Sequence, residues 1–472
     1  MKSYLRKFSL MPLAAALVLA GCATPPAIDA SKFPAPPAAF KEADGHWIAA
    51  APADAQPRGD WWKTFGDPVL DELMSHAMER NDRIQVAAAR LAQAKALVRE
   101  TDAQRSPQIG ASAGAARGTQ PQTGTLPLTL LNAGANLSYE IDLFGKLSRA
   151  TDAAQLDAQA REAQQRSTQL LVQAEVAQIY FALRSLDIEV DIVNDTAAAY
   201  RESLRLIEAR FSAGDVAELE VARVRTEAAA TESDALAVQG QRARFEHALA
   251  VLVGEVASTF SVTRTDWNAT LPNIPAGVPS TVLARRPDVA ASQRQLLAAQ
   301  ARVGVAQAAW FPDLQLTATG GYASPELSDL FKWSARSWGI GTLLSLPIFD
   351  GGRRNAGVQA AKADMDGALA TYREQVLVAF KDVEDQLSAL RLLREQAQAE
   401  STAVSSASRA TALSNSRYRN GYIGQFELLD AQRSELRNRR EAARVNAAQY
   451  QATVGLIRAL GGAWDTGKGA SS

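Results

Sequence analysis

The chain has 472 residues, with 50 Lys and Arg against 51 Asp and Glu and a formal charge of −1 at pH 7. This balance excludes the basic surface typical of nucleic-acid binding, so we expect no nucleic-acid partner. The single cysteine and three isolated histidines provide neither a disulfide framework nor metal-ligand spacing, so we expect no metal and no cofactor.

The chain begins with an export signal. Three basic residues precede an apolar run over 10–19, which is too short to span a bilayer as a helix and has the form of a secretory signal. The run ends in Leu19-Ala20-Gly21-Cys22, which resembles the lipobox of bacterial lipoproteins, where the cysteine becomes the lipidated first residue. The alternative is a chance run of small residues before an idle thiol. An oxidising compartment weighs against it, because no second cysteine exists to pair with Cys22.

These features predict a cleaved signal peptide over 1–21 and a lipid on Cys22. Ala23 follows in place of Asp, which by resemblance to enterobacterial lipoprotein sorting favours the outer membrane. Removal of the signal leaves 47 Lys and Arg against 51 Asp and Glu, a formal charge of −4. Seven prolines lie between 23 and 60, so we interpret 22–60 as an irregular, extended tether beside the lipid.

The remainder of the chain is a duplication. Matching segments lie 205 residues apart early in each copy and 207 apart later; examples are Ser106-Pro107 with Phe311-Pro312, Leu143-Phe144 with Ile348-Phe349, and Gly254 with Gly461. Such a period is far longer than that of solenoid repeats, so one half-protein occurs twice. We expect a first repeat over 61–254, a Pro-containing linker over 255–286, a second repeat over 287–461, and a flexible tail over 462–472.

Each repeat is expected to contain one very long helix, because no Gly or Pro lies between Gly145 and Gly214 or between Gly367 and Gly421. A helix of about 60 residues would be roughly 90 Å long. In the first repeat, apolar residues at alternating steps of four and three form a coiled-coil seam that runs from Val172 to Phe211. Polar residues interrupt the second seam, so the two helices have different environments.

A returning helix follows each long helix, from 215 to about 253 and from 426 to about 460. Gly214 and Gly421 stand where a left-handed C-cap residue would end the first helix of each pair. Each repeat therefore predicts a long helical hairpin.

Two strand-like segments precede each hairpin. Apolar residues alternate with others from Leu137 to Leu143, from Leu314 to Ala318 and from Trp338 to Ile348, and a weaker segment begins at Ile109. Each is about ten residues long, which is the length of a tilted transmembrane strand. Alternation alone does not distinguish a soluble sandwich, whose apolar face points inward, from a porin-like wall, whose apolar face meets lipid.

Aromatic residues mark both ends of these strands and resemble the interfacial girdles of outer-membrane barrels. They are Phe144, Trp310, Phe311 and Phe349 at the helix-side ends, and Tyr322, Trp333 and Trp338 at the loop-side ends. The alternative is a small soluble sheet capped by aromatics. Four strands cannot close a barrel, and an open edge in lipid leaves backbone groups unpaired. Several copies must therefore pool their strands, and residue reasoning permits two copies with eight strands or three with twelve.

Several motifs resemble the TolC family, and within it the outer-membrane lipoproteins of RND-type multidrug efflux pumps. The motifs are Arg286-Pro287-Asp288-Val289, Phe311-Pro312-Asp313-Leu314, Leu346-Pro347-Ile348-Phe349-Asp350-Gly351-Gly352, Arg417-Tyr418-Arg419-Asn420-Gly421 and Glu427-Leu428-Leu429-Asp430-Ala431-Gln432-Arg433. The resemblance covers about 61–462. It implies a mainly α-helical protein with a transmembrane β-barrel: a homotrimer whose pooled strands form a twelve-stranded barrel, continued by a long periplasmic helical tunnel.

The resemblance also implies a function. Such a channel is a passive exit duct through which small molecules such as drugs pass from the periplasm to the exterior. A periplasmic adaptor protein opens it and an inner-membrane RND-type pump supplies the energy. The expected location is the outer membrane, where the lipid on Cys22 and the barrel both contact outer-membrane lipid, with an extension into the periplasm.

The same resemblance assigns roles to residues around the hairpin turns. It places Glu220 and Tyr418 among the contacts that hold the periplasmic entrance shut, and Glu427 and Asp430 in acidic rings at the constriction. Ile423 stands where some members have a gate arginine, which puts that ionic contact in doubt. The alternative for the acidic residues is a favourable interaction with a helix N-terminus.

The turns themselves are expected to form the contact surface for the adaptor. Its predicted members are Gly214, Gly421, Arg210 and Arg417.

Two other function classes fit the sequence less well. An enzyme lacks a convergent site here, because the chain has no nucleophile motif and no phosphate-binding loop, and Gly351-Gly352 is better explained as a turn. A structural lipoprotein, such as a periplasmic adaptor, would also combine a lipobox with a coiled coil, but it would not need two strand pairs with aromatic bands. Within the channel class, local chemistry does not separate drug or metal efflux from peptide or protein export.

Overall fold

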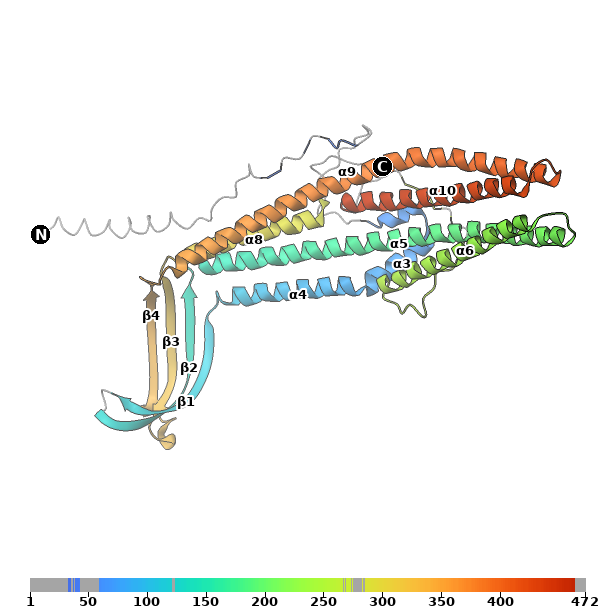
Figure 1. Ribbon diagram of the computed structural model, residues 1–472. Coiled ribbons are helices and arrows are strands. Elements are labelled where there is room, and N and C mark those ends of the chain that lie inside the picture. Colours follow the sequence, from blue (N-terminus) through green and yellow to red (C-terminus); the bar gives the residue numbers. More distant parts are fainter. Residues whose placement is uncertain are drawn as a thin grey trace, which may run out of the picture. The chain divides into compact units, whose positions relative to one another are not determined.

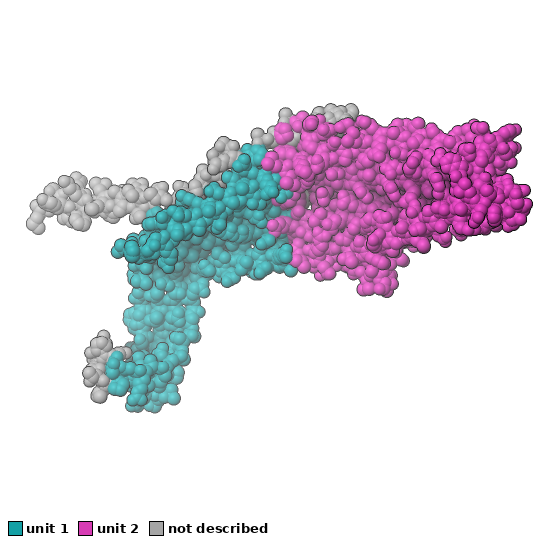
Figure 2. Space-filling view, viewed as in Figure 1, with its two compact units in different colours: residues 1–34, 89–163, 290–375 teal, residues 35–88, 164–289, 376–472 magenta. Residues whose placement is uncertain are grey.

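The protein is described by a computed structural model that covers residues 33, 34, 37, 39–42, 59–120, 124–265, 267, 269–272, 274, 282 and 285–462. The predicted signal peptide and Cys22 lie outside the described residues, as does the predicted tail beyond 462. The chain divides into two compact units, coloured separately in Figure 2. The sheet unit contains 89–163 and 290–375, and the hairpin unit contains 35–88, 164–289 and 376–472.

The sheet unit contains four antiparallel strands in the order β1-β2-β3-β4 (Figure 1). Their bounds are Gln108–Gln120 (β1), Gly124–Ile141 (β2), Asp313–Ser324 (β3) and Arg336–Ser345 (β4). Short 3-10 turns, Leu327–Asp329 (η3) and Trp333–Ala335 (η4), lie between β3 and β4. The two predicted strand pairs are confirmed, and they join in one sheet because β2 also pairs with β3, as in Leu137 opposite Ala318.

The last strand is shorter than the alternation predicted. The pattern extends to Ile348, but β4 ends at Ser345 and Ile348 lies beyond it with 93% of its surface exposed. Pro347 explains the difference, because proline has no N–H to donate to a strand ladder. By contrast β1 and β2, with 13 and 18 residues, are longer than the expected ten.

Aromatic contacts occur at both ends of the strands. The Phe144 and Phe311 rings stack with centroids 4.7 Å apart, just after β2 and just before β3. At the opposite end of β3, the rings of Tyr322 and Phe331 meet edge to face at 5.7 Å.

The remaining elements are helices. They are η2 (Trp61–Phe65), α3 (Pro68–Arg80), α4 (Asp82–Ala103), α5 (Lys146–Ser212), α6 (Glu218–Leu252), α8 (Pro287–Ala308), α9 (Arg353–Arg419) and α10 (Gln425–Ala459). Both α5 and α9 have 67 residues, which corresponds to about 100 Å. No helix in the described part of the chain is long and apolar enough to cross a membrane.

The two predicted hairpins are present as α5 with α6 and α9 with α10 (Figure 1). Helix α9 begins at Arg353, well before Gly367, where the Gly-free run starts. Both Gly357 and Gly367 lie inside the helix, where an added Cβ would meet open space. Exposed glycine weakens a helix but does not end it.

Burial differs between the two long helices as expected. The seam of α5 is closed, with Val172, Val176 and Leu183 all 0% exposed, although Phe211 at its end is 44% exposed. In α9 the seam is buried at Val383 and Leu390 but half-exposed at Leu393 and Val404 within this chain.

The main core of the hairpin unit is aromatic and joins both repeats. Phe65 of η2 lies 4.8 Å from Phe181 of α5, ring centroid to centroid, and Phe181 lies 5.0 Å from Tyr450 of α10. Trp267, from the linker, packs 4.8 Å from Tyr450. Such ring pairs add stability beyond the area that they bury.

A short part of the predicted tether also packs on this unit. Phe40 is buried, with its ring 6.5 Å from that of Phe380 on α9. The backbone N–H groups of Lys41 and Glu42 donate to the carboxylate of Glu384 at 2.7 and 3.0 Å.

The duplication is visible in matching contacts. The Asn81 side-chain amide donates to the carbonyl of Leu252 at 2.8 Å, and at the corresponding positions of the second repeat the Arg286 guanidinium donates to the carbonyl of Ala459 at 3.3 Å. The two repeats therefore close the end of their returning helix in the same way, with different side chains.

Candidate functional site

The two hairpin turns have the same backbone geometry. Gly214 and Gly421 adopt the left-handed conformation that the sequence predicted, with φ of 80° and 76°. In each turn the next residue's N–H donates to a carbonyl five positions earlier, to Arg210 in the first turn and Arg417 in the second, both at 2.9 Å. These bonds satisfy carbonyl groups that the end of a helix leaves free.

One side-chain contact joins the two turns. The guanidinium of Arg210, at the end of α5, donates to the hydroxyl of Tyr418, at the end of α9, at 3.2 Å. It connects the first repeat with the second at their tips. Two residues that the sequence analysis assigned to different roles, an adaptor contact and a gate contact, are thus bonded to each other.

The predicted acidic residues are not drawn into this contact. Glu220 is half-exposed in the first turn of α6, while Glu427 and Asp430 are exposed in the first two turns of α10. Among the described residues, none of the three makes an ion pair or a side-chain hydrogen bond with another. Asp430 does interact with Arg433 electrostatically, because the pKa of that guanidinium is raised mainly by its bond to Glu227 and also by the charge of Asp430.

An ion-pair ladder links the two hairpins farther along the helices, and the sequence analysis did not anticipate it. Arg433 of α10 pairs with Glu227 of α6. Seven residues later on the same two helices, Arg440 pairs with Asp234 at 2.7 Å. Arg440 also donates to the buried carboxylate of Glu189 on α5 at 2.7 Å. A detectable signal existed: acids seven residues apart on one helix and arginines seven apart on the other.

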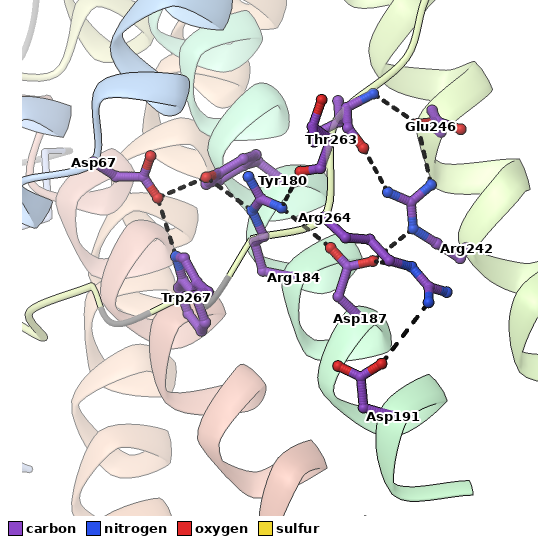
Figure 3. A network of polar contacts seen from close by, with 11 residues as sticks. Asp67, Tyr180, Arg184, Asp187, Asp191, Arg242, Glu246, Thr263, Arg264 and Trp267 are labelled. Carbon is purple, nitrogen blue, oxygen red and sulfur yellow. Dashed lines mark hydrogen bonds and ion pairs between the residues drawn. The ribbon is translucent and has the colours of Figure 1, made fainter. Parts of the chain in front are cut away.

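A buried polar network holds the linker against α5 (Figure 3). The hydroxyl of Tyr180 donates to the carboxylate of Asp67 at 2.6 Å and accepts from Arg184 Nε at 3.0 Å. The indole N–H of Trp267 donates to the same carboxylate oxygen of Asp67 at 3.0 Å. Burial, and then the bond to Asp67, raises the pKa of Tyr180 far above its ordinary value, so the hydroxyl keeps its proton.

The network continues to α6 through Asp187. Arg184 lies 3.2 Å from one carboxylate oxygen of Asp187, and Arg242 of α6 lies 2.6 Å from the other. Burial by itself would lower the pKa of Arg242, but its bonds to Asp187 and Glu246 raise it. All buried charges here have partners, which is the condition under which burial is tolerated. The network explains the packing of the linker and contains no catalytic arrangement.

The structure of the described residues shows no group of three or more His, Cys, Asp or Glu side chains placed to hold a metal ion.

Comparison with known proteins identifies the family. The family model described as "Outer membrane efflux protein" matches residues 73–255 and 278–462. One segment covers most of each repeat, and the second begins within the predicted linker. The chain belongs to the outer membrane efflux protein family. The earlier resemblance to TolC-type channels is therefore confirmed.

Individual relatives align over nearly the whole chain. The solvent efflux pump outer membrane protein SrpC of Pseudomonas putida is 31% identical over 470 residues, covering 97% of this chain and 99% of SrpC. The cation efflux system protein CusC of Escherichia coli O6:H1 is 29% identical over 456 residues, covering 96% and 98%. The solved structure of the outer-membrane channel OprN is similar with a TM-score of 0.85 and 30% identity, covering 94% of this chain and 100% of OprN.

The protein is thus the outer-membrane channel component of an efflux system, and it extends into the periplasm. It is a channel protein and not an enzyme. The strand pairs and hairpins predicted from the sequence are the parts from which this fold is built.

Proposed function

We propose that three copies of the chain pool their strands in a twelve-stranded barrel, which a periplasmic tunnel of helical hairpins continues. The support is the open sheet, whose edge strands β1 and β4 each have no strand partner on one side among the described residues. Unpaired strand edges are not tolerated in lipid. On β4, Ile340 and Leu344 are 81% and 64% exposed, as lipid-facing residues would be. Two copies with eight strands are the alternative, and the family resemblance favours three.

The proposed role is a passive exit duct for small molecules such as drugs, energised by an inner-membrane RND-type pump. The names of the relatives differ in cargo, with solvent for SrpC and cation for CusC. Membership of the family therefore does not fix which compounds the channel carries.

A periplasmic adaptor is proposed to bind at the hairpin turns. Apolar and aromatic side chains are exposed there, with Phe211 and Leu219 at 44% and 59% in the first turn and Tyr422 and Phe426 at 75% and 55% in the second. Exposed apolar residues gathered at one place favour a protein contact. Arg210 and Arg417, both exposed, would flank this surface.

The gate is proposed to combine two elements. The contact between Arg210 and Tyr418 is the observation on which this proposal mainly rests, because it ties the ends of α5 and α9 together. Glu427 and Asp430, which make no ion pair with a residue that the structure describes, would form acidic rings in a trimer and favour cations over anions at the entrance. An adaptor opens such a gate only if it binds the open state more tightly than the closed one.

Conductance in planar bilayers tests the gate. Tyr418→Phe removes the hydroxyl that accepts from Arg210, so we expect more open time. The control is Tyr422→Phe, which alters an exposed tyrosine of the same turn. Glu427→Ala with Asp430→Ala should lower cation selectivity. Unchanged closure in the first variant, together with unchanged selectivity in the second, would remove these residues from the gate.

The partners are tested in cells. Deletion of the gene should cause particular compounds to accumulate, and cross-linking of the intact protein should recover one adaptor and one inner-membrane pump. Recovery of a pump of another class would contradict the proposed RND-type partner.

The proposal also includes a lipid on Cys22 and a division of the chain into six segments. The segments are 1–21, 22–60, 61–254, 255–286, 287–461 and 462–472. They rest on the lipobox resemblance and on the duplication.

A further inference from the structure

A pocket in the hairpin unit lies among α5, α6 and α10 and has an arginine-rich wall. Four arginines of α10 line it, at positions 433, 437, 440 and 444. Steps of four, three and four residues place them on one face of the helix. Two glutamates, Glu227 and Glu441, also line the pocket, so its walls have more positive than negative charges.

One of the residues that line the pocket also has a buried hydroxyl without a partner. Tyr200 of α5 is among the lining residues and is 1% exposed, and its hydroxyl makes no hydrogen bond with any residue that the structure describes. Buried polar groups are nearly always paired, so an unpaired one calls for an explanation. Burial, and then the nearby charge of Glu227, raises the pKa of Tyr200 to about 12. The hydroxyl therefore keeps its proton at physiological pH and is able to donate it to an acceptor.

Three of the four arginines are held in place by carboxylates. Arg433 pairs with Glu227, Arg440 with Glu189 and Asp234, and Arg444 with Glu189 at 3.1 Å. These pairs fix the wall of the pocket and neutralise most of its charge. A guanidinium has five N–H groups, and each of these pairs uses only some of them.

Arg437 is the exception. It lines the pocket, is exposed, and has no ion pair or hydrogen bond with any residue in the described part of the chain. Arg444 also lies 3.8 Å from Glu441. The pocket thus offers one guanidinium without an ion pair, one unsatisfied hydroxyl donor and spare N–H groups on paired arginines. All three features favour a hydrogen-bond acceptor that has one or a few negative charges.

We propose that this pocket binds a single oxyanion group, a carboxylate or a phosphate, through Arg437 and the Tyr200 hydroxyl. Arg433 and Arg440 contribute further N–H donors from the same wall. Tyr200 belongs to the first repeat and Arg437 to the second. A bound anion would therefore link the two hairpins at a point along their helices, away from the turns. The site goes beyond the exit-duct function and does not depend on the proposed gate.

The same chemistry has two sources: a free solute, or an Asp or Glu side chain of another protein. For the first, purified full-length protein is titrated with inorganic phosphate and with succinate, at constant ionic strength kept with chloride. We expect a saturable rise in melting temperature, because a ligand that binds only the folded state stabilises it. Arg437→Gln should weaken the response at least tenfold, and Tyr200→Phe several-fold.

Two comparisons keep this result specific. Arg439→Gln, on the same helix but outside the pocket and paired with Glu435, should respond like the wild type. Tyr200→Phe should not lower the melting temperature without anion, since the hydroxyl has no partner to lose. A loss of stability there would show that the hydroxyl has a structural partner and would count against the site.

For the second source, a photo-crosslinking residue replaces Thr231, which lines the pocket. An adduct that maps by mass spectrometry to an acidic segment of a partner, and that Arg437→Gln abolishes, would assign the site to a protein carboxylate. A saturable response to phosphate or succinate without such an adduct would assign it to a free solute. No saturable response together with no Arg437-dependent adduct would overturn the proposal.

Discussion

Two glycines at the ends of the returning helices stand where a side chain has no room. Gly254 has a φ of 73°, and a Cβ there would lie 2.8 Å from Arg80 Cβ; Gly461 has a φ of 90°, and its Cβ would lie 2.8 Å from the carbonyl oxygen of Arg285. The left-handed conformation alone costs an L-residue about 1–2 kcal/mol. We expect Gly254→Ala and Gly461→Ala each to lower the melting temperature of the purified protein.

The matched control, Gly240→Ala, should change stability in the opposite direction. Gly240 lies inside α6, where an added Cβ meets nothing within 4 Å. Gly240→Ala should therefore stabilise the helix by roughly 0.5–1 kcal/mol. If all three substitutions had the same effect, neither the conformation nor the close contact at 254 and 461 would explain those glycines.

The hydroxyl of Tyr180 bridges two members of the buried network, Asp67 and Arg184. Tyr180→Phe deletes a donor to Asp67 and an acceptor for Arg184 while the ring remains. Leaving such buried partners unsatisfied costs about 1–3 kcal/mol, so the melting temperature should fall. Tyr422→Phe, at a tyrosine that is 75% exposed, serves as the control and should leave it unchanged. A fall of equal size in both variants would contradict the role of the network.

Sequence reasoning at this scale succeeded where a local pattern exists. Gly214 and Gly421 end runs without Gly or Pro, so their left-handed geometry was predictable. The bond between Asp67 and Tyr180 joins residues 113 positions apart, and no spacing rule points to it. Likewise, the contact between Arg210 and Tyr418 depends on how the two hairpins lie against each other, which the sequence alone does not show.

At the scale of elements, successive side chains of β4 lie on opposite faces of the sheet. Leu344 and Leu343 are adjacent, of the same type and similarly exposed in one chain, at 64% and 56%, but they point to opposite faces. With Leu344 facing lipid, Leu344→Arg should cost about 2–4 kcal/mol at the bilayer midplane and less near the interfaces. Leu343→Arg, on the same face as Ser345 and toward the lumen, should be tolerated.

The measurement is the yield of assembled oligomer in outer membranes, compared between the two variants. A harmful Leu343→Arg with a harmless Leu344→Arg would reverse the assigned faces. Equal damage from both would show that this part of β4 is enclosed by protein on either side.

Element types were predictable, and their ends less so. The 67 residues of α5 follow from the absence of helix breakers between Gly145 and Gly214. The run without Gly or Pro before Gly421 gave no start for α9, which begins at Arg353 because exposed glycines such as Gly367 are tolerated in a long helix. The end of β4 was misplaced for the opposite reason, since Pro347 was accepted within a strand. The ladder of Glu227 and Arg433 was missed because only apolar heptads were followed.

At the scale of the whole molecule, an open sheet requires other copies. The strand order leaves β1 and β4 as edges, and each edge presents a row of backbone groups that lipid cannot satisfy. The sequence predicted this need but not the number of copies, because edge geometry permits eight or twelve strands. The number of copies therefore stays a proposal, which rests on the family resemblance.

The proposed lipid at Cys22 gives the assembled protein a second attachment to the membrane. A single acyl chain binds membranes only marginally, and stable anchoring needs several signals. In a trimer the barrel already provides one that spans the membrane, so the lipid matters most before the barrel has formed. Cys22→Ala should therefore reduce processing and yield while the oligomer that does form remains inserted.

The check is intact mass of the mature wild type, which should begin at residue 22 with lipid attached, together with membrane fractionation of the variant. An unmodified thiol in the mature wild type would refute the lipid, whereas a lipidated wild type with a variant that no longer inserts would mean that the barrel is not sufficient as an anchor.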